Sequence, residues 1–322
     1  MTLSQSIYSV IAEEKKENIS RDSKTSPQTL TIFAITATIL FWASAYPAIT
    51  VALTAYTPGE IGFLRYAIAS IVLISYASIK KISLPKKQDL IAIAACGFIG
   101  FTLYNFMLNA GEMTVNSGMA SFIISAEVAV IALLSRLFFN ETLGKIGWIG
   151  VFLCIIGVGF ISLTGDGKLQ LSWGILEVFI ATLATSVYSV MQKPLLNKYT
   201  PIEFTSYAIW AGTLFLFLLA PQSILSVIDA PLKPTLAIIY MGIFPGAIAY
   251  LAWSYIISQI PASRAGSYLA IIPVVALFIA WLWLGEIPTL IALLGGAVVF
   301  VGVILVDRHK IKNPPRDGGS SE

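Results

Sequence analysis

The sequence is poor in charged residues. Asp, Glu, Lys and Arg make up only 11% of its 322 residues, whereas 57% are hydrophobic. A soluble globular domain carries about 25% charged residues, so this chain has too little polar surface to cover a globule in water. The composition indicates a protein whose solvent is lipid, and the net charge of +3 gives no sign of nucleic-acid binding.

Cysteine and histidine are scarce as well. Cys96 and Cys154 both lie inside apolar runs, which argues against a disulfide framework or a metal site, and the single histidine, His309, lies in the C-terminal tail. The sequence contains neither a cluster of metal ligands nor a G-x-x-x-x-G-K-[ST] phosphate loop. We therefore expect no enzyme activity, no cofactor and no ATP hydrolysis by this chain, so any transport is passive or driven by a gradient.

Long hydrophobic runs, by contrast, are abundant. A membrane-spanning helix needs about 20 mostly apolar residues, and short turn sequences such as Thr57-Pro58-Gly59 separate runs of that length. The runs lie near residues 29–52, 60–79, 88–109, 117–138, 146–163, 172–192, 203–221, 235–257, 265–284 and 289–307. They predict an all-α membrane protein with ten transmembrane helices, between polar tails at residues 1–28 and 308–322.

The basic residues indicate how the chain is oriented. If the N-terminus is cytoplasmic, 17 of the 20 Lys and Arg residues fall in cytoplasmic segments, and only Lys168 and Lys233 fall outside. The remaining one, Arg65, lies inside a predicted span. Because Lys and Arg accumulate in cytoplasmic loops, we predict a multi-pass protein of the bacterial inner membrane with both termini in the cytoplasm.

The chain also contains an internal repeat. A shift of 145 residues superimposes several glycines and the glutamates that precede two of the spans. The pairs are Gly97 with Gly242, Glu141 with Glu286, Gly150 with Gly295, and Gly157 with Gly302. They divide the chain into five-helix repeats at residues 29–163 and 172–307. Because five is odd, the second repeat is inverted in the membrane, an architecture typical of secondary transporters with a central binding site.

Three ionisable residues inside the spans are the first candidates for that site: Arg65, Glu127 and Glu177. Burying a charge in a bilayer costs several kcal/mol, so such residues usually face a cavity or a partner. Glu127 lies near the middle of its span, where it would meet a substrate ammonium group or a coupling proton. The alternative is a structural ion pair of Arg65 with Glu177 or Glu127.

Polar side chains form stripes on three of the predicted helices. Asn105, Asn109 and Glu112 rise toward the outside, whereas Tyr250, Ser254 and Ser258 point toward the cytoplasm, so the two stripes would line an outer and an inner vestibule. Hydroxyls at positions 182, 186 and 189 are expected mainly to bond their own helix. Glu141 and Glu286 are expected to cap helix N-termini, and the Gly150 and Gly157 face to pack closely against another helix.

Aromatic residues away from the span ends complete the candidate pathway. They are Trp42, Tyr46, Tyr104, Tyr188, Tyr250, Trp253 and Tyr268. Each could simply pack in the core, but together they would suit a planar or amphipathic solute. Pro47, Pro245 and Pro273 interrupt three spans, and each would produce a fixed kink or a hinge.

With these residues in view, the chain resembles the drug/metabolite transporter superfamily, and within it the ten-helix EamA-type transporters. The motifs that carry the resemblance follow one another over residues 30–306. They are Phe41-Trp42-Ala43-Ser44, Pro58 with Arg65-Tyr66, Ser125-Ala126-Glu127-Val128, Asn140-Glu141, Ala262-Ser263-Arg264-Ala265, Pro273-Val274, Leu284-Gly285-Glu286, Gly295 and Gly302. The family pattern often has proline at position 128 and glycine at position 140, so Val128 argues against a kink in the fourth span.

The resemblance implies two inverted five-helix repeats around a cavity lined by spans one, three, four, six, eight and nine. It also implies transport of amino acids or related metabolites, commonly outward. Arg65 would favour an anionic group and Glu127 a cationic one, so a zwitterion suits both. The expected partners are a small-molecule substrate, a coupling proton or counter-substrate, and the lipid bilayer, with the chain acting as a monomer or a homodimer.

Two other functions fit the same sequence features. One is an importer or exchanger of a nucleotide-like, cofactor-like or vitamin solute. The other is a lipid flippase, which would need a lateral opening between helices. Transport assays in vesicles and a lipid-scrambling assay distinguish these hypotheses from amino-acid export.

Overall fold

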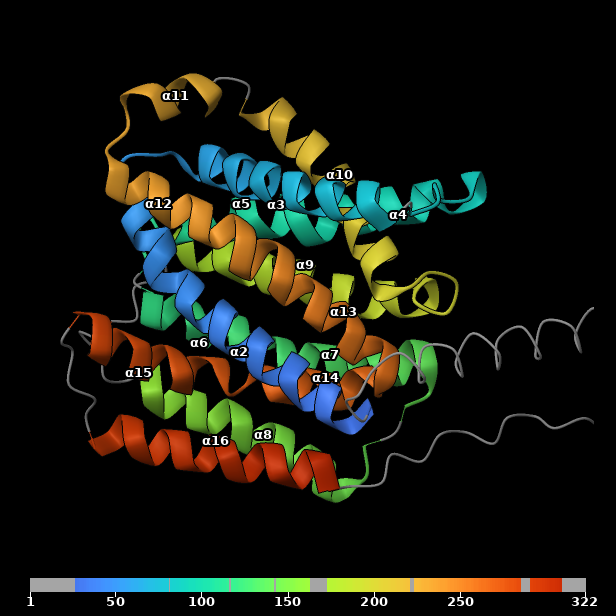
Figure 1. Ribbon diagram of the computed structural model, residues 1–322. Coiled ribbons are helices and arrows are strands. Elements are labelled where there is room, and N and C mark those ends of the chain that lie inside the picture. The colour runs from blue at the N-terminus through green and yellow to red at the C-terminus, as the bar shows by residue number, and fades with distance from the viewer. Residues whose placement is uncertain are drawn as a thin grey trace, which may run out of the picture.

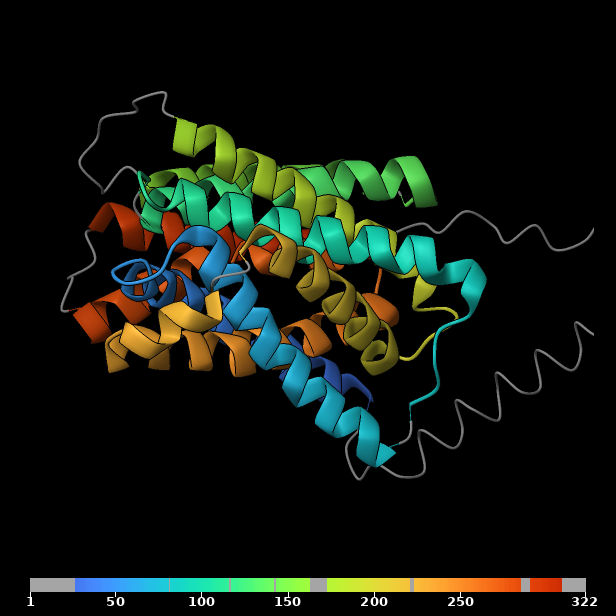
Figure 2. The ribbon, with the colours of Figure 1, turned by 90° about the horizontal axis from the view of Figure 1, so that it is seen from above.

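The described part of the chain consists of helices that run between the same two ends of one bundle (Figure 1, Figure 2). A computed structural model describes residues 27–80, 82–115, 117–141, 143–162, 173–220, 223–284 and 290–308. Every regular element within these ranges is a helix. The apolar composition explains this, because only helices and closed barrels satisfy their own backbone groups in lipid.

The first half of the chain contains two long helices followed by two interrupted ones. Helix α2 is Pro27–Ala52, α3 is Pro58–Lys80, and the next helical run joins η1 (Lys87–Asp89), α4 (Leu90–Gly97), the π-helical η2 (Phe98–Leu103) and α5 (Tyr104–Gly111). The remaining elements are α6 (Ser117–Ser125), α7 (Glu127–Phe139) and α8 (Lys145–Ser162).

The second half repeats this order with one short addition. Its elements are α9 (Trp173–Leu195), α10 (Pro201–Leu219), the added α11 (Ser223–Asp229), α12 (Leu232–Met241), the π-helical η3 (Gly242–Ile248), α13 (Ala249–Gln259), α14 (Ala262–Leu269), α15 (Ile272–Leu284) and α16 (Leu290–Arg308). The π-helical segment η2 directly follows Gly97, and η3 begins at Gly242, the glycine that the 145-residue shift pairs with Gly97.

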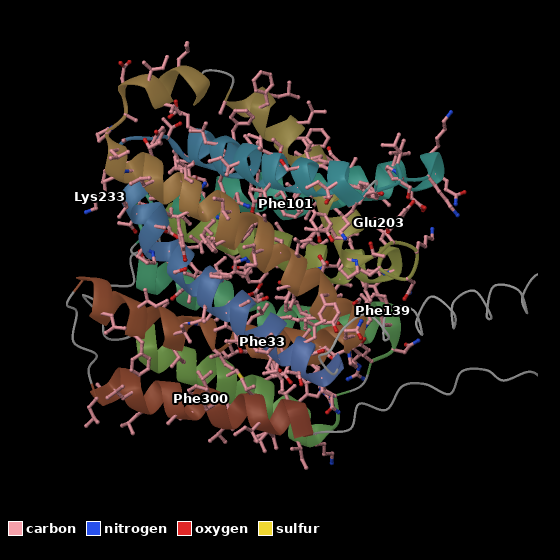
Figure 3. The ribbon with its side chains drawn as sticks, viewed as in Figure 1. Phe33, Phe101, Phe139, Glu203, Lys233 and Phe300 are labelled. Atoms are coloured by element: carbon pink, nitrogen blue, oxygen red, sulfur yellow. The ribbon has the colours of Figure 1, made fainter. Side chains whose placement is uncertain are left out.

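Within the described residues, six helical runs are long and apolar enough to cross a membrane: Gln28–Ala52, Pro58–Lys80, Lys87–Gly111, Trp173–Leu196, Pro201–Leu218 and Leu232–Gln259. The other predicted spans coincide with α6 and α7, with α8, with α14 and α15, and with α16. Large apolar side chains on the periphery, such as Phe33 and Phe300 in Figure 3, are exposed. Such a surface suits lipid, and Phe101 lies fully buried inside the bundle.

The fourth helix of each half is broken near its middle. The break between α6 and α7 lies at Ala126, and the break between α14 and α15 lies at Ala270 and Ile271. Pro273, which has no amide hydrogen to donate, accounts for the second break. Val128 occupies the matching place in the first half, where the absence of proline weakens the case for a kink, yet the helix is broken there as well. Backbone bonds at Ala126 tighten to the i−3 type, as in Ala126 N to Ile123 O at 3.2 Å.

Helix contacts are closest where both partners have small residues. A Cβ atom on Gly97 would lie 2.6 Å from the Ala208 carbonyl oxygen, and one on Gly242 would lie 2.8 Å from the Arg65 carbonyl oxygen. Because Arg65 and Ala208 are 143 positions apart, these are matching contacts between the third helix of one half and the second helix of the other. Small residues permit such close backbone approach inside a membrane.

Helices α8 and α16 form a further pair of this kind. A Cβ on Gly150 would lie 2.6 Å from the Gly302 carbonyl oxygen, and one on Gly157 would lie 2.6 Å from the Gly295 carbonyl oxygen. The predicted packing role of these glycine faces is therefore confirmed. The glycine face of α8 packs against the glycine face of α16 in the same chain.

Candidate functional site

A small cavity lies at the centre of the bundle, between the two halves of the chain. Its volume is about 20 Å³, which is room for about one water molecule. Its lining comes from α2, α3, α5, α6, α7, α9, α13 and α15, and consists of Trp42, Ala45, Tyr46, Ile49, Arg65, Tyr104, Leu108, Ile124, Glu127, Thr185, Tyr250 and Ile272. These are the six spans that the resemblance implied, joined by Arg65 from the second span.

Aromatic rings form one wall of the cavity. The indole of Trp42 donates from Nε1 to the carbonyl oxygen of Pro245 at 3.2 Å. It meets the ring of Tyr250 edge-on, with centroids 5.1 Å apart, and lies 5.7 Å from the ring of Trp253. The polar edge of Trp42 is thus bonded to the π-helical segment η3, which leaves its apolar face toward the cavity.

The positive charge of the cavity comes from Arg65 on α3, which is only 3% exposed. Its Nη1 donates to Asn105 Oδ1 at 3.1 Å, and Asn105 Nδ2 donates to the Tyr66 hydroxyl at 2.9 Å. Its Nε has no hydrogen-bond partner among the described residues. A neutral amide therefore orients the guanidinium without neutralising it, and the charge stays available to an anionic group of a ligand.

The negative charge comes from Glu127, which directly follows the break at Ala126. As the first residue of α7, it lies at a helix N-terminus, where the helix dipole favours a carboxylate. Glu127 is 4% exposed, and its carboxyl group interacts with the side chain of Thr185 on α9, which lines the same cavity. The alternative of a structural ion pair does not appear among the described residues, which join Arg65 to neither Glu127 nor Glu177.

The other predicted site residues lie farther from the cavity. Tyr188 packs its ring 6.1 Å from that of Tyr250, and Trp253 donates to the Ser189 hydroxyl at 3.2 Å, so both form a layer behind the lining. Tyr268 packs against the separate apolar cluster around Val128. Glu177 lines a groove of about 690 Å³ at one end of the bundle, beside Trp173 and Met113 on the surface.

The two polar stripes are buried rather than open. Asn105, Asn109 and Ser254 are fully buried, so they line no wide vestibule in this conformation. Asn109 donates to the Pro58 carbonyl oxygen at 3.1 Å, and Ser254 donates to Gln192 Oε1 at 2.9 Å. The expectation for the third stripe is confirmed for two of its hydroxyls, because Thr182 and Ser186 each bond the carbonyl oxygen four residues earlier on their own helix.

Glu141 ties the two halves together at the end of the bundle where Lys193 lies. Its carboxylate accepts from Lys193 Nζ at 2.7 Å, from the Ser263 hydroxyl at 2.8 Å and from the backbone amides of Ser263 and Ala262 at 3.2 and 3.3 Å. The predicted helix cap is thus present, but on the N-terminus of α14 in the other half rather than on α8. Glu286 lies outside the described residues.

Sequence reasoning missed Thr185 and Lys193. Thr185 lies on the α9 face that also carries Tyr188 and Gln192, one residue away from the hydroxyl stripe that the prediction followed. A hydroxyl facing a buried carboxylate cannot be told from one that bonds its own backbone until the neighbouring helix is placed. Lys193 was counted only as a basic loop residue, although its ammonium reaches Glu141 of the other half.

Comparison with known proteins places the chain. The sequence profile of the EamA-like transporter family matches it twice, over residues 29–163 and over residues 172–307. The chain belongs to the EamA-like transporter family. It is therefore a multi-pass membrane protein of a family of small-molecule transporters within the drug/metabolite transporter superfamily.

Individual relatives agree with this assignment. The chain is 39% identical over 263 residues to "Uncharacterized transporter YdfC" of Bacillus subtilis, a match that covers 81% of this chain and 86% of the relative. It is 34% identical over 280 residues to "Probable terminal-alkyne amino-acid exporter" of Streptantibioticus cattleyicolor, covering 87% and 94%. The crystal structure of another protein matches this chain with a TM-score of 0.71 at 17% identity, and the match covers 87% of this chain and 96% of the other. That similarity shows a shared fold.

Proposed function

We propose that this EamA-like protein is a secondary transporter that exports amino acids or related amphipathic compounds across the bacterial inner membrane by alternating access. The observation that carries the proposal is the central cavity, which is lined by a guanidinium, a carboxylate and aromatic rings. A substrate carboxylate would pair with Arg65, where paired N–H donors suit two oxygens. A substrate ammonium would pair with Glu127, and Trp42 and Tyr250 would hold the side chain.

The substrate class has separate support from the comparisons. The relative with 34% identity carries the name of an amino-acid exporter, and its match spans 94% of that protein. An α-amino acid brings one anionic and one cationic group, which is the complement that the cavity offers. A lipid flippase would instead need these charges beside a lateral opening.

We further propose that the halves, residues 29–163 and 172–307, are inverted repeats of five spans each. The matching contacts of Gly97 and Gly242 support this, as does the reciprocal pairing of α8 with α16. The capping boxes that begin α3 and α10 also match. Thr57 with Glu60 and Thr200 with Glu203 each show bonds of 2.8, 2.8 and 3.4 Å.

The size of the cavity and the bonds around it support the proposal of alternating access. A volume of about 20 Å³ cannot hold an amino acid, so the halves must separate at one end to admit one. Glu141 of the first half, bonded to Lys193 and Ser263 of the second, closes one end. At the opposite end, Tyr56 bonds the Thr235 hydroxyl at 2.7 Å across the same two halves.

The end that carries Lys193 is proposed to be cytoplasmic. Lys80, Lys87, Lys145 and Arg308 begin or end helices at this end, which we call the basic end. Lys233 lies at the opposite end, at the left of Figure 3, whereas Glu203 and Phe139 lie toward the basic end at the right. By the positive-inside rule, the basic end faces the cytoplasm, and α2 begins and α16 ends at this end (Figure 1).

The test is counterflow into proteoliposomes that contain the purified protein. Liposomes loaded with one unlabelled amino acid at a time are diluted into the same labelled amino acid, and transient accumulation above equilibrium is measured. We expect accumulation with amphipathic amino acids, and none in protein-free liposomes. Accumulation with nucleotides or vitamins alone would replace the amino-acid assignment, and movement of labelled lipid without solute counterflow would indicate a flippase.

A further inference from the structure

Glu112 lies beyond the cavity, on the route to the end opposite the basic end. The helical run that begins at Lys87 ends at Gly111, and Glu112 follows directly. Tyr104 and Leu108 on this run both line the cavity. Residues four apart lie on the same face of a helix, one turn above each other, so Glu112 continues the stripe of Tyr104 and Leu108 by one turn outward.

The carboxylate of Glu112 is buried without a hydrogen-bond partner. Neither Oε1 nor Oε2 is accessible, and neither has a partner among the described residues. Oδ1 of Asn109, one turn earlier on the same helix, is also buried and without a partner. Buried polar atoms are nearly always paired, so an unpaired carboxylate beside a transport cavity calls for a functional explanation.

Glu112 faces titratable and charged groups from each neighbouring helix. Arg65 on α3 and the hydroxyls of Tyr46 on α2 and Tyr104 on α5 interact with it electrostatically. Glu60, at the start of α3, is held by Thr57 and Ser226. Glu177, near the start of α9, lines the surface groove. Tyr46, which lines the cavity, interacts electrostatically with Glu127 as well as with Glu112.

We propose that Glu112 is the outer entry of a proton path that continues past the Tyr46 hydroxyl to Glu127 and couples export to inward proton movement. A proton from the outer solution binds the Glu112 carboxylate when that end opens. It passes to Glu127, and it leaves to the cytoplasm when the basic end opens, so no other reactant is consumed.

This inference rests on the proposed transport function and deepens it. A proton is indicated as the coupled ion, because the side chains of Glu112, Tyr46 and Glu127 are groups that take up and release protons. Intramembrane carboxyl and hydroxyl groups in series are also the usual composition of proton relays in pumps and transporters. Substrate binding would use Arg65 and Glu127, and Glu112 would be needed only for coupling.

The test compares the wild-type protein with Glu112→Gln and with Met113→Gln, which alters the adjacent exposed residue. Proteoliposomes are assayed for counterflow at equal pH and for accumulation driven by a pH gradient, while a pH-sensitive dye records proton movement. We expect Glu112→Gln to keep counterflow within about twofold and to lose gradient-driven accumulation and proton movement by about tenfold. Met113→Gln should behave as wild type in every assay.

The experiment distinguishes failure of the proton-path inference from failure of the proposed transport function. Gradient-driven accumulation by Glu112→Gln at the wild-type level would overturn the inference, as would wild-type counterflow that no pH gradient stimulates. In both cases the transport function would stand. Absence of counterflow in the wild-type protein would instead overturn the proposed function itself. If Glu112→Gln does not fold, Glu112→Asp is tested instead. This variant keeps a titrating carboxyl group, so it should retain proton coupling with a shifted pH midpoint. Proton coupling with an unchanged pH midpoint would count against the inference.

Discussion

The two halves of the bundle share a scaffold but differ in charge. Matching positions make matching contacts, as the glycines of the third helices and the capping boxes of the second helices show. The three ionisable residues near the cavity have apolar counterparts, however. Arg65 matches Ala208 after 143 residues, and Glu112 and Glu127 match Ile257 and Ile272 after 145 residues.

The difference indicates that helix packing requires matching residues in both halves, whereas the charged groups of the cavity are needed only once. Closing two halves around a cavity requires that both present small residues where helices cross. A ligand with one carboxylate and one ammonium needs only one arginine and one carboxylate in the wall. Ile272, the counterpart of Glu127, also lines the cavity, so the second half supplies apolar surface where the first supplies ionic groups.

The largest expected effect is a loss of transport when an ionic group of the first half is removed from the cavity. Glu127→Gln removes the negative charge but keeps the shape of the side chain, so substrate ammonium loses its partner and transport falls by about 100-fold. Counterflow measures the loss, and thermal unfolding in detergent should show a stability near that of the wild type. Unchanged transport would reduce Glu127 to a packing role.

Glu177→Gln is the matched control for that substitution. Glu177 is also a carboxylate within the helices, but it lines the surface groove rather than the cavity. Its substitution should leave counterflow unchanged. Equal losses at the two positions would mean that charge removal acts on the protein in general and not through the cavity.

On the scaffold side, equivalent substitutions should have equal costs. Gly97→Ala and Gly242→Ala each place a methyl group within 2.6–2.8 Å of a backbone carbonyl oxygen, and such overpacking costs about 3 kcal/mol. Unfolding temperatures should fall by similar amounts in both variants. Gly296→Ala, whose nearest neighbour is the movable side chain of Val274 at 3.2 Å, should change stability less.

A smaller cost is expected from Glu141→Gln. The carboxylate bonds Lys193 and the N-terminus of α14, and its loss removes charge-assisted bonds that are worth about 2 kcal/mol together. Because Lys193 is 24% exposed, water compensates for part of the lost pairing. The unfolding temperature should drop modestly, and labelling of residues lining the cavity from the basic end should increase. Reduced labelling would show that Glu141 does not hold that end closed.

The smallest predicted effect returns to the symmetry of the scaffold. Thr57→Ala and Thr200→Ala each remove one matching N-cap, at a cost of about 1 kcal/mol. Thermal unfolding should show both decreases. A clear loss at one position and none at the other would mean that the two capping boxes are equivalent in sequence but not in their energetic contribution.

The helices could be predicted from the sequence because each apolar run is marked by its own composition and ended by its own turn residues. The relation between the halves was also readable, since Gly97, Gly242 and the Thr-Pro turns recur at nearly constant spacing. The break at Ala126 was not readable. Pro273 predicts the matching break in the second half, whereas Val128 predicts no break in the first half.

The cavity was predictable in part. Arg65, Glu127 and the aromatic residues of α2 and α5 were identified because an ion or a polar ring inside a span needs a polar surrounding. Thr185 and the inter-half bonds of Glu141 depend on which helix lies opposite. Glu177 shows the converse: its depth along α9 suggested a pathway role, but its direction around the helix places it on the surface groove.

Alternating access requires the basic end to open, so the most direct test is to prevent that opening. Glu141→Cys combined with Ser263→Cys places two thiols where a 2.8 Å hydrogen bond now joins the halves, and a short bifunctional thiol reagent links them. The native Cys96 and Cys154 are buried, and each single variant treated alike serves as control. Counterflow should stop on linking and return when the reagent is cleaved. Undiminished counterflow by the fully linked protein would contradict alternating access between the two halves.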